Sequence, residues 1–93
     1  MKFSEEKKNE YWNHFLSQKQ FWGFKFTLKK LEKIKSILWD DAYFWEDILF
    51  RHNGYTETPE QMKERSKSTY DHCIGNMAGM ISEALYKNKL TKW

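Results

Sequence analysis

Apolar residues recur three, four or seven positions apart along three stretches of the 93-residue chain. This spacing places them on one side of a helix that turns 100° per residue. The three stretches predict helices over about 5–22, 27–52 and 59–87. The whole chain has one Pro and four Gly, too few for a protein of many strands and turns. The pattern therefore predicts an all-α fold.

Capping residues mark the start of each predicted helix. Ser4, Thr27 and Thr58 each precede a helical stretch. Their side-chain oxygens can accept hydrogen bonds from the free amides of the first turn. The clearest start is at Thr58, where Pro59 takes the first helical position and Gln61 completes a capping box. The third helix should therefore begin at Pro59.

The second and third predicted helices are joined by a short connection, so they should lie antiparallel. Gly54, which is free to take a positive φ, ends the second helix. A simple hairpin register sets Trp45 against Ser66 and also sets Leu38 against Cys73. We expect one domain over 1–93, a long antiparallel helical hairpin with an aromatic-rich N-terminal helix laid across it. This arrangement is a three-helix bundle.

The second predicted helix is apolar on more than one side. Beyond the side that faces the third helix, it carries two apolar strips: Trp39, Tyr43 and Phe50, and, opposite them, Ile37, Phe44 and Ile48. A helix that is apolar all round is usually central or shared with another chain. The N-terminal helix can cover one strip, so we expect a second copy to cover the other, most simply in a twofold homodimer. The alternative is that these residues are isolated and exposed, which is normal in single-chain proteins.

Charges along the same helix are segregated. Four lysines crowd its first half and four carboxylates its second half: Lys29, Lys30, Lys33, Lys35, Asp40, Asp41, Glu46 and Asp47. Both runs oppose the helix dipole. Two copies packed antiparallel would set each basic half on the other's acidic half. Equally, basic residues of the third helix, Lys63, Arg65 and Lys67, can reach the acidic half within one chain.

Composition restricts the class of protein only loosely. The formal net charge of +3 is too small to imply nucleic-acid binding by itself, and aromatic residues make up 18% of the chain. A single cysteine, Cys73, allows no internal disulfide, so we expect an intracellular, cytoplasmic protein. Cys73 falls on the apolar side of the third helix and should be a small buried hydrophobe. We expect no signal peptide, no membrane helix, no cofactor and no metal site.

One candidate binding site is an anion site at the start of the second helix. It combines lysines and aromatic side chains around free helix amides: Trp22, Phe24, Lys25, Lys29 and Lys30. Lysines with aromatic faces suit nucleotides or single-stranded nucleic acid, through phosphate contact and base stacking. The alternative is a solvated lysine face beside core aromatics.

A second candidate is a polar strip on the third predicted helix: Arg65, Thr69, His72, Asn76 and Glu83. Arg65 and His72 also fit R-x6-H, a pattern that resembles one used by HEPN-type RNases. That resemblance covers two residues and implies acid chemistry at a phosphodiester. The alternative is a solvated or interface strip in which Arg65 pairs with Glu46.

Two glycines of the third helix, Gly75 and Gly79, suggest close packing against another helix, because each costs about 1 kcal/mol relative to Ala. Together these patterns favour a small, non-enzymatic, oligomeric binding protein that acts through a protein partner. Inhibitors, adaptors, regulatory subunits and accessory proteins of phages or mobile elements fit that description. The alternatives are a nucleotide or single-stranded nucleic-acid binder and an HEPN-like RNase using Arg65 and His72.

Overall fold

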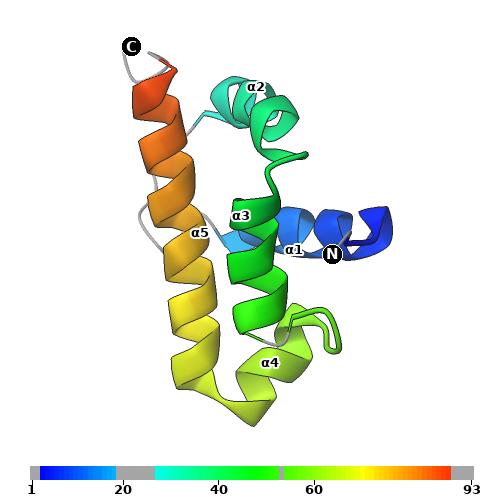
Figure 1. Cartoon of the computed structure of the whole chain (residues 1–93). Helices are drawn as coiled ribbons and strands as arrows, with labels where there is room; N and C mark the ends of the chain where they lie inside the picture. Colours follow the sequence, from blue (N-terminus) through cyan, green and yellow to red (C-terminus); the bar gives the residue numbers. More distant parts are fainter. Residues whose placement is uncertain (1–2, 19–26, 53, 89–93) are drawn as a thin grey trace.

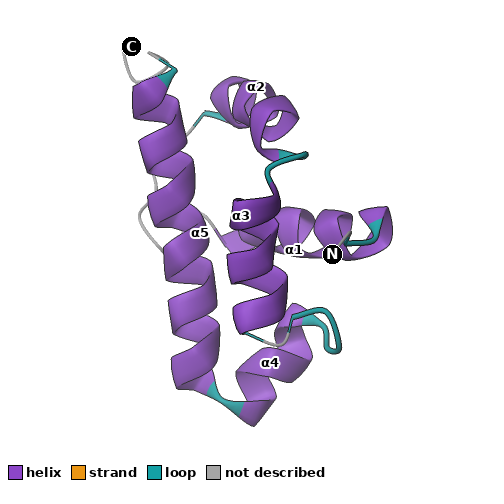
Figure 2. Cartoon of the chain, in the orientation of Figure 1, coloured by secondary structure: helices purple, strands orange, loops and turns teal. Residues whose placement is uncertain are grey.

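The computed structural model describes residues 3–18, 27–52 and 54–88, and these form helices without any strand (Figures 1 and 2). The elements are α1 (Glu5–Gln18), α2 (Leu28–Leu38), α3 (Ala42–Trp45), a π-helical turn η1 (Glu46–Arg51), α4 (Pro59–Arg65) and α5 (Lys67–Lys87). The all-α fold is therefore confirmed. Two of the three long helices expected from the sequence are each broken once.

The predicted helix starts are confirmed. The amide of Lys7 donates to the Ser4 hydroxyl at 3.1 Å, and that of Lys30 to the Thr27 hydroxyl at 3.2 Å. Thr58 and Gln61 form the full capping box, with bonds of 2.9 and 3.1 Å. These local signals hold because they depend only on residues within one turn of each other.

The predicted helix over 27–52 is wrong. It stops at Leu38, turns through Trp39 and Asp40, and restarts after Asp41, whose carboxylate accepts from the Phe44 amide at 3.1 Å. The break places Asp40 and Asp41 at the N-terminal end of α3, where the helix dipole favours negative charge. Glu46 and Asp47 follow further along, because η1 continues directly from α3. Part of the conflict between the charge pattern and the dipole of one long helix is thereby removed.

The predicted helix over 59–87 is also broken. Ser66 is extended, with φ −158° and ψ 104°, and its hydroxyl caps α5 by accepting from the Thr69 amide at 3.2 Å. The short helix α4 consequently turns across the end of the hairpin, as Figure 1 shows. The Cys73 thiol faces the carbonyl of Ile48, with Sγ and O 3.7 Å apart, where the simple register placed Leu38. Because α4 occupies the turn, α5 is displaced along the hairpin.

The core lies where α1 crosses behind the hairpin of α3–η1 and α5 (Figure 1). From α1, three large aromatic side chains are buried: Tyr11, Trp12 and Phe15. They meet apolar residues of α2, α3, η1, α4 and α5 in one cluster. Within the described ranges, no helix is both long enough and apolar enough to cross a bilayer.

Glycine positions show how closely the elements approach. A Cβ on Gly54 would lie 3.0 Å from the Ile48 carbonyl oxygen and 3.0 Å from the Tyr11 ring. Gly54 is therefore needed for close approach between the loop and α1. By contrast, a Cβ on Gly75 or Gly79 would meet nothing within 4 Å, so the close helix packing expected at those two residues is not found within the described chain.

Candidate functional site

The outer side of α3 and η1 carries unusually large apolar side chains. Ala42, Tyr43, Glu46 and Phe50 are exposed there, whereas residues 44, 45, 47, 48 and 49 are buried. The exposed fraction is 70% for Tyr43 and 48% for Phe50. Ile37, at the end of α2, is 49% exposed. We call Ile37, Ala42, Tyr43, Glu46 and Phe50 the Tyr43 face.

Two residues expected on an interface lie inside the chain instead. Phe44 and Ile48 are 1% and 0% exposed and belong to the core. The break at residues 39–41 rotates α3 relative to α2, so Ile37 is no longer in phase with them. Trp39 is half-buried, and its Nε1 donates to the Glu5 carboxylate at 2.9 Å. Only Ile37, Tyr43 and Phe50 of the six predicted interface residues remain substantially exposed.

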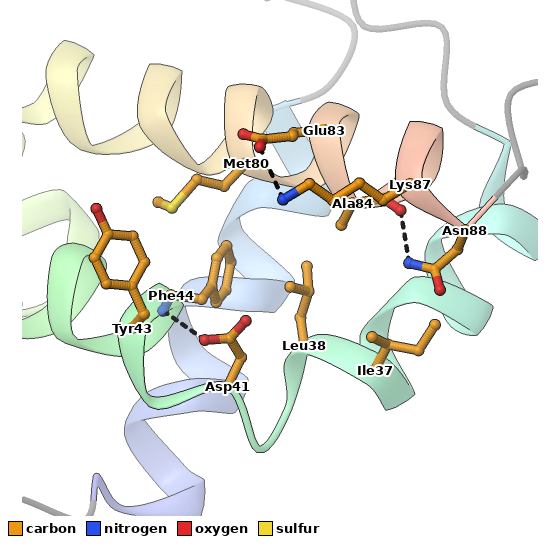
Figure 3. Close-up of a pocket in the computed structure, with 10 residues that line it drawn as sticks. All are labelled: Ile37, Leu38, Asp41, Tyr43, Phe44, Met80, Glu83, Ala84, Lys87 and Asn88. Carbon is orange, nitrogen blue, oxygen red and sulfur yellow. Dashed lines mark hydrogen bonds and ion pairs between the residues drawn. The ribbon is translucent and has the colours of Figure 1, made fainter.

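A hollow of about 290 Å³ opens beside Tyr43, between the α2–α3 junction and the end of α5 (Figure 3). Its apolar lining comes from Ile37, Leu38, Phe44, Met80 and Ala84. Polar groups surround this lining: Asp41, the Tyr43 ring with its hydroxyl, Glu83, Lys87 and Asn88. Such a hollow, apolar inside and polar at its edge, suits an apolar side chain of a partner.

Further hollows continue around η1. Tyr43 also lines a second hollow of about 260 Å³, together with Glu46 and Phe50. Glu46 and Phe50 line a third with Phe3 and Ala42, of about 200 Å³. Each hollow shares residues with the next, so the Tyr43 face is one continuous uneven surface. The Phe50 ring is stacked on Tyr55, with centroids 5.9 Å apart, which extends the aromatic area.

The π-helical turn holds the inner side of η1 in place. The Asp47 carbonyl accepts from Nδ1 of buried His52 at 2.7 Å, and the Cys73 thiol faces the carbonyl of Ile48. Burial raises the pKa of the Cys73 thiol to about 12. Cys73 is thus the small buried hydrophobe predicted from its position, and its role is to hold η1 against α5.

The surface around the Tyr43 face is acidic on a chain that is basic overall. Five carboxylates border these hollows and a further one lined by Phe3, Trp39 and Ala42: Asp40, Asp41, Glu46, Asp47 and Glu83. Three cations border them, each in an ion pair: Lys8 with Glu5, Arg51 with Asp47, and Lys87 with Glu83. Among the described residues, neither Asp40 nor Glu46 has an ion-pair partner. The excess of two negative charges contrasts with a formal net charge of +3 for the chain.

The predicted anion site lies mostly outside the described residues. Trp22, Phe24 and Lys25 fall in that part of the chain. Of the two described members, Lys29 is exposed on α2 and Lys30 is half-buried. The described residues therefore show only the basic side of α2.

The predicted polar strip is divided between two helices. Arg65 belongs to α4 and pairs with Glu57, through guanidinium–carboxylate bonds of 2.6, 3.0 and 3.1 Å. The expected pairing with Glu46 is therefore wrong, because the break at Ser66 turns α4 away from α5. The remaining members lie on α5: Thr69, His72, Asn76 and Glu83. Asn76 donates to Asp47 at 3.4 Å, Glu83 pairs with Lys87 at 3.1 Å, and His72 is exposed.

Titratable groups with shifted pKa values lie mainly at helix junctions. His14 is held between Tyr70, whose hydroxyl is 2.7 Å from Nε2, and Glu60, 3.4 Å from Nδ1. Burial lowers the pKa of His14. Burial raises the pKa values of Tyr11 and Tyr70. These groups join α1 to the α4–α5 region and do not line the hollows of the Tyr43 face.

Sequence reasoning missed several residues that form the face. The apolar pattern did not connect Ala42, Met80, Ala84 or Lys87 with Tyr43. The available signal was Asp41, an Asp three residues before Phe44, which is a helix N-cap spacing. Reading that cap would have placed a new helix start at Ala42.

Comparison with known proteins gives no assignment. The chain matches no protein-family model, no curated protein and no solved structure.

Proposed function

We propose that this chain is a protein-binding module and that the Tyr43 face is its docking surface. The observation that carries the proposal is the exposure of Tyr43, Ile37 and Phe50 around continuous hollows. Among the described residues, eighteen hydrophobic side chains are buried in the core, so the exposed ones are exceptions that need an explanation. Large apolar groups gathered on one surface are typical of interaction sites.

Burial of this face supplies the driving force. Removing apolar surface from water contributes about 25 cal/mol per Å². Tyr offers a large apolar ring with a hydroxyl that can still form a hydrogen bond, which explains why it is common at interfaces. Tyr43 combines both properties at the edge of the hollow of about 290 Å³.

Binding fits the Tyr43 face better than catalysis does. Groups with perturbed pKa values concentrate at catalytic sites. Here the shifted groups are Tyr11, His14, Tyr70 and Cys73, which pack helices together, and Arg65, which pairs with Glu57. An inhibitor, adaptor or regulatory subunit uses an apolar face with charged edges in this way.

Site-directed photo-crosslinking tests the proposal. A benzophenone amino acid replaces Tyr43 in one protein and exposed Asn13 of α1 in a matched control. Each protein is illuminated in extract from its native source. We expect a discrete adduct from position 43, identified by mass spectrometry, that is lost when Phe50→Ser is added. Binding should then be reproduced with the purified partner.

Two results would contradict the proposal. Adducts of the same identity from positions 43 and 13 would mean that capture is nonspecific. A discrete adduct that survives Phe50→Ser and Ile37→Ser would mean that the Tyr43 face is not the docking surface.

A further inference from the structure

The exposed side of α2 forms a second stripe. Positions 28, 29, 32, 33, 36 and 37 are all exposed and recur at intervals of three or four, so they share one side of the helix. Leu28 is 57% exposed and Ile37 is 49% exposed. They stand at the two ends of this α2 stripe and, being nine residues apart, at its opposite edges. Lys29, Glu32 and Lys33 lie between them. The α2 stripe is apolar at both ends and charged in the middle.

The outer side of α3–η1 has the same order of residue types. Tyr43 and Phe50 are apolar at its two ends, and Glu46 is charged between them. The two stripes also match in length. α2 has 11 residues, and α3 with η1 has 4 and 6, so at about 1.5 Å per residue each runs for about 15–17 Å.

The charges of the two stripes are opposite. Lys29 and Lys33, with Glu32 between them, give the α2 stripe an excess of one positive charge. The Tyr43 face has an excess of carboxylates, of which Asp40 and Glu46 have no ion-pair partner among the described residues. Lys29 and Lys33 likewise take part in no ion pair within the described chain. Both halves of a complementary contact are therefore carried by this one chain.

The two stripes are continuous. Ile37, at the end of the α2 stripe, and Tyr43, at the start of the α3–η1 stripe, line the same hollow (Figure 3). A twofold axis through this junction, lying in the plane of contact, would therefore lay each α2 stripe on the other copy's α3–η1 stripe. Both contacts would form at once, and the assembly would close at two chains.

We propose that the occupant of the Tyr43 face is a second copy of this chain, docked through its α2 stripe in a twofold dimer. This inference rests on the proposed function, because it names the partner of the same surface. The twofold axis makes the stripes antiparallel. Ile37 of the second copy then lies near Tyr43 and its Lys33 near Glu46, while its Leu28, at the opposite edge of the stripe, lies at the border of the contact.

Charge reversal tests this arrangement sharply. One variant carries Lys29→Glu and Lys33→Glu, which makes the α2 stripe acidic. The other carries Asp40→Lys and Glu46→Lys, which makes the Tyr43 face basic. All four residues are exposed, so both variants should fold, as circular dichroism and thermal unfolding would verify. A control with Glu6→Lys and Glu64→Lys changes two exposed carboxylates on α1 and α4.

Light scattering at low salt then gives the mass of each sample. We expect the wild type and the control at twice the chain mass of 11.4 kDa. Each reversed variant alone should have the mass of one chain, because both of its contacts become repulsive. An equimolar mixture of the two should return to twice the chain mass, because both contacts of the mixed pair join opposite charges.

Each other outcome would overturn the inference. A mixture that stays at single-chain mass would show that the α2 stripe does not meet the Tyr43 face. A mass that keeps growing with concentration would show head-to-tail assembly without twofold closure. If the wild type has single-chain mass while position 43 crosslinks specifically to another protein, the second copy is excluded and the proposed function stands. If position 43 also yields no specific adduct, both fail.

Discussion

The Nζ of Lys8 lies 2.9 Å from the carbonyl oxygen of Trp39, at the residue where α2 ends. The same oxygen accepts from Nε1 of Trp45 at 3.0 Å. Lys8 is buried, and its Nζ also lies 3.4 Å from the Glu5 carboxylate. A carbonyl freed at the end of a helix needs partners when it is buried. Lys8 and Trp45 supply them, so α1 helps to fix the break that orients the Tyr43 face.

Replacing Lys8 should destabilise the fold through this junction. Lys8→Met keeps most of the side-chain length but removes the donor to Trp39. We expect the free energy of unfolding to fall by about 1–3 kcal/mol, the usual cost of losing one partner of a buried hydrogen bond. Urea denaturation measures it. Lys67→Met, which removes an exposed pairing with Asp71, should have little effect. Equal losses in the two variants would contradict this role of Lys8.

Replacing glycine by alanine should lower the free energy of unfolding at one position and raise it at another. Gly54→Ala places a methyl group 3.0 Å from the Ile48 carbonyl oxygen and the Tyr11 ring, so we expect a loss of about 1–3 kcal/mol. Gly79→Ala meets open space inside α5 and should gain about 0.5–1 kcal/mol through helix propensity. Chemical denaturation of both variants compares them directly. A stable Gly54→Ala protein would mean that the loop does not approach α1 this closely.

Stability should fall in mild acid because of His14. Its pKa is lowered in the folded protein, chiefly by burial and with a smaller effect of Lys63, while Glu60 acts in the opposite direction. The unfolded chain therefore binds the proton more readily once the pH drops below about 6.5, and protonation favours unfolding. His14→Gln removes this effect and can retain hydrogen bonds to Tyr70 or Glu60.

Thermal unfolding on either side of that pH provides the measurement. Between about pH 7.5 and about pH 5.5, Tm should fall more for the wild type than for His14→Gln. Both proteins contain the same carboxylates, so the carboxylates should contribute equally to the fall in Tm of each protein. An equal fall in Tm would show that His14 carries no part of the acid sensitivity.

Neighbouring aromatic residues of α3 should respond differently to a charge. Phe44→Glu places a carboxylate at a fully enclosed core position, and we expect loss of the folded state. Tyr43→Glu changes a side chain that is 70% exposed, and we expect the variant to keep the helical circular dichroism of the wild type. If the Phe44→Glu protein folds, the side chain at position 44 must point outward, as expected for an unbroken helix.

That contrast shows where sequence reasoning was sufficient. The all-α fold and the capping box at Thr58 were predicted correctly, because apolar period and capping depend on neighbours within a few residues. Ile37, Tyr43 and Phe50 were also identified as candidates for an interface. The structure shows that these three side chains are exposed, and their place in an interface stays a prediction.

The two helix breaks could not be predicted from apolar spacing. Apolar residues continue in phase through residues 39–41, and Ser66 reads equally well as a small residue inside a helix. One of the two donors to the Trp39 carbonyl is Lys8, which is distant along the chain. Once the break is missed, Phe44 and Ile48 are placed on the wrong side. The segregated charges and Asp41 were the local signals that pointed to a new helix start.

The mass of the full chain in solution tests the central claim most directly. Light scattering over a concentration series compares the wild type with Tyr43→Glu/Phe50→Glu, with circular dichroism to verify that the variant is folded. We predict that the wild type approaches twice the chain mass of 11.4 kDa and that the variant remains at the mass of one chain. A wild type that stays at single-chain mass throughout, or a folded variant that still doubles in mass, would contradict the account.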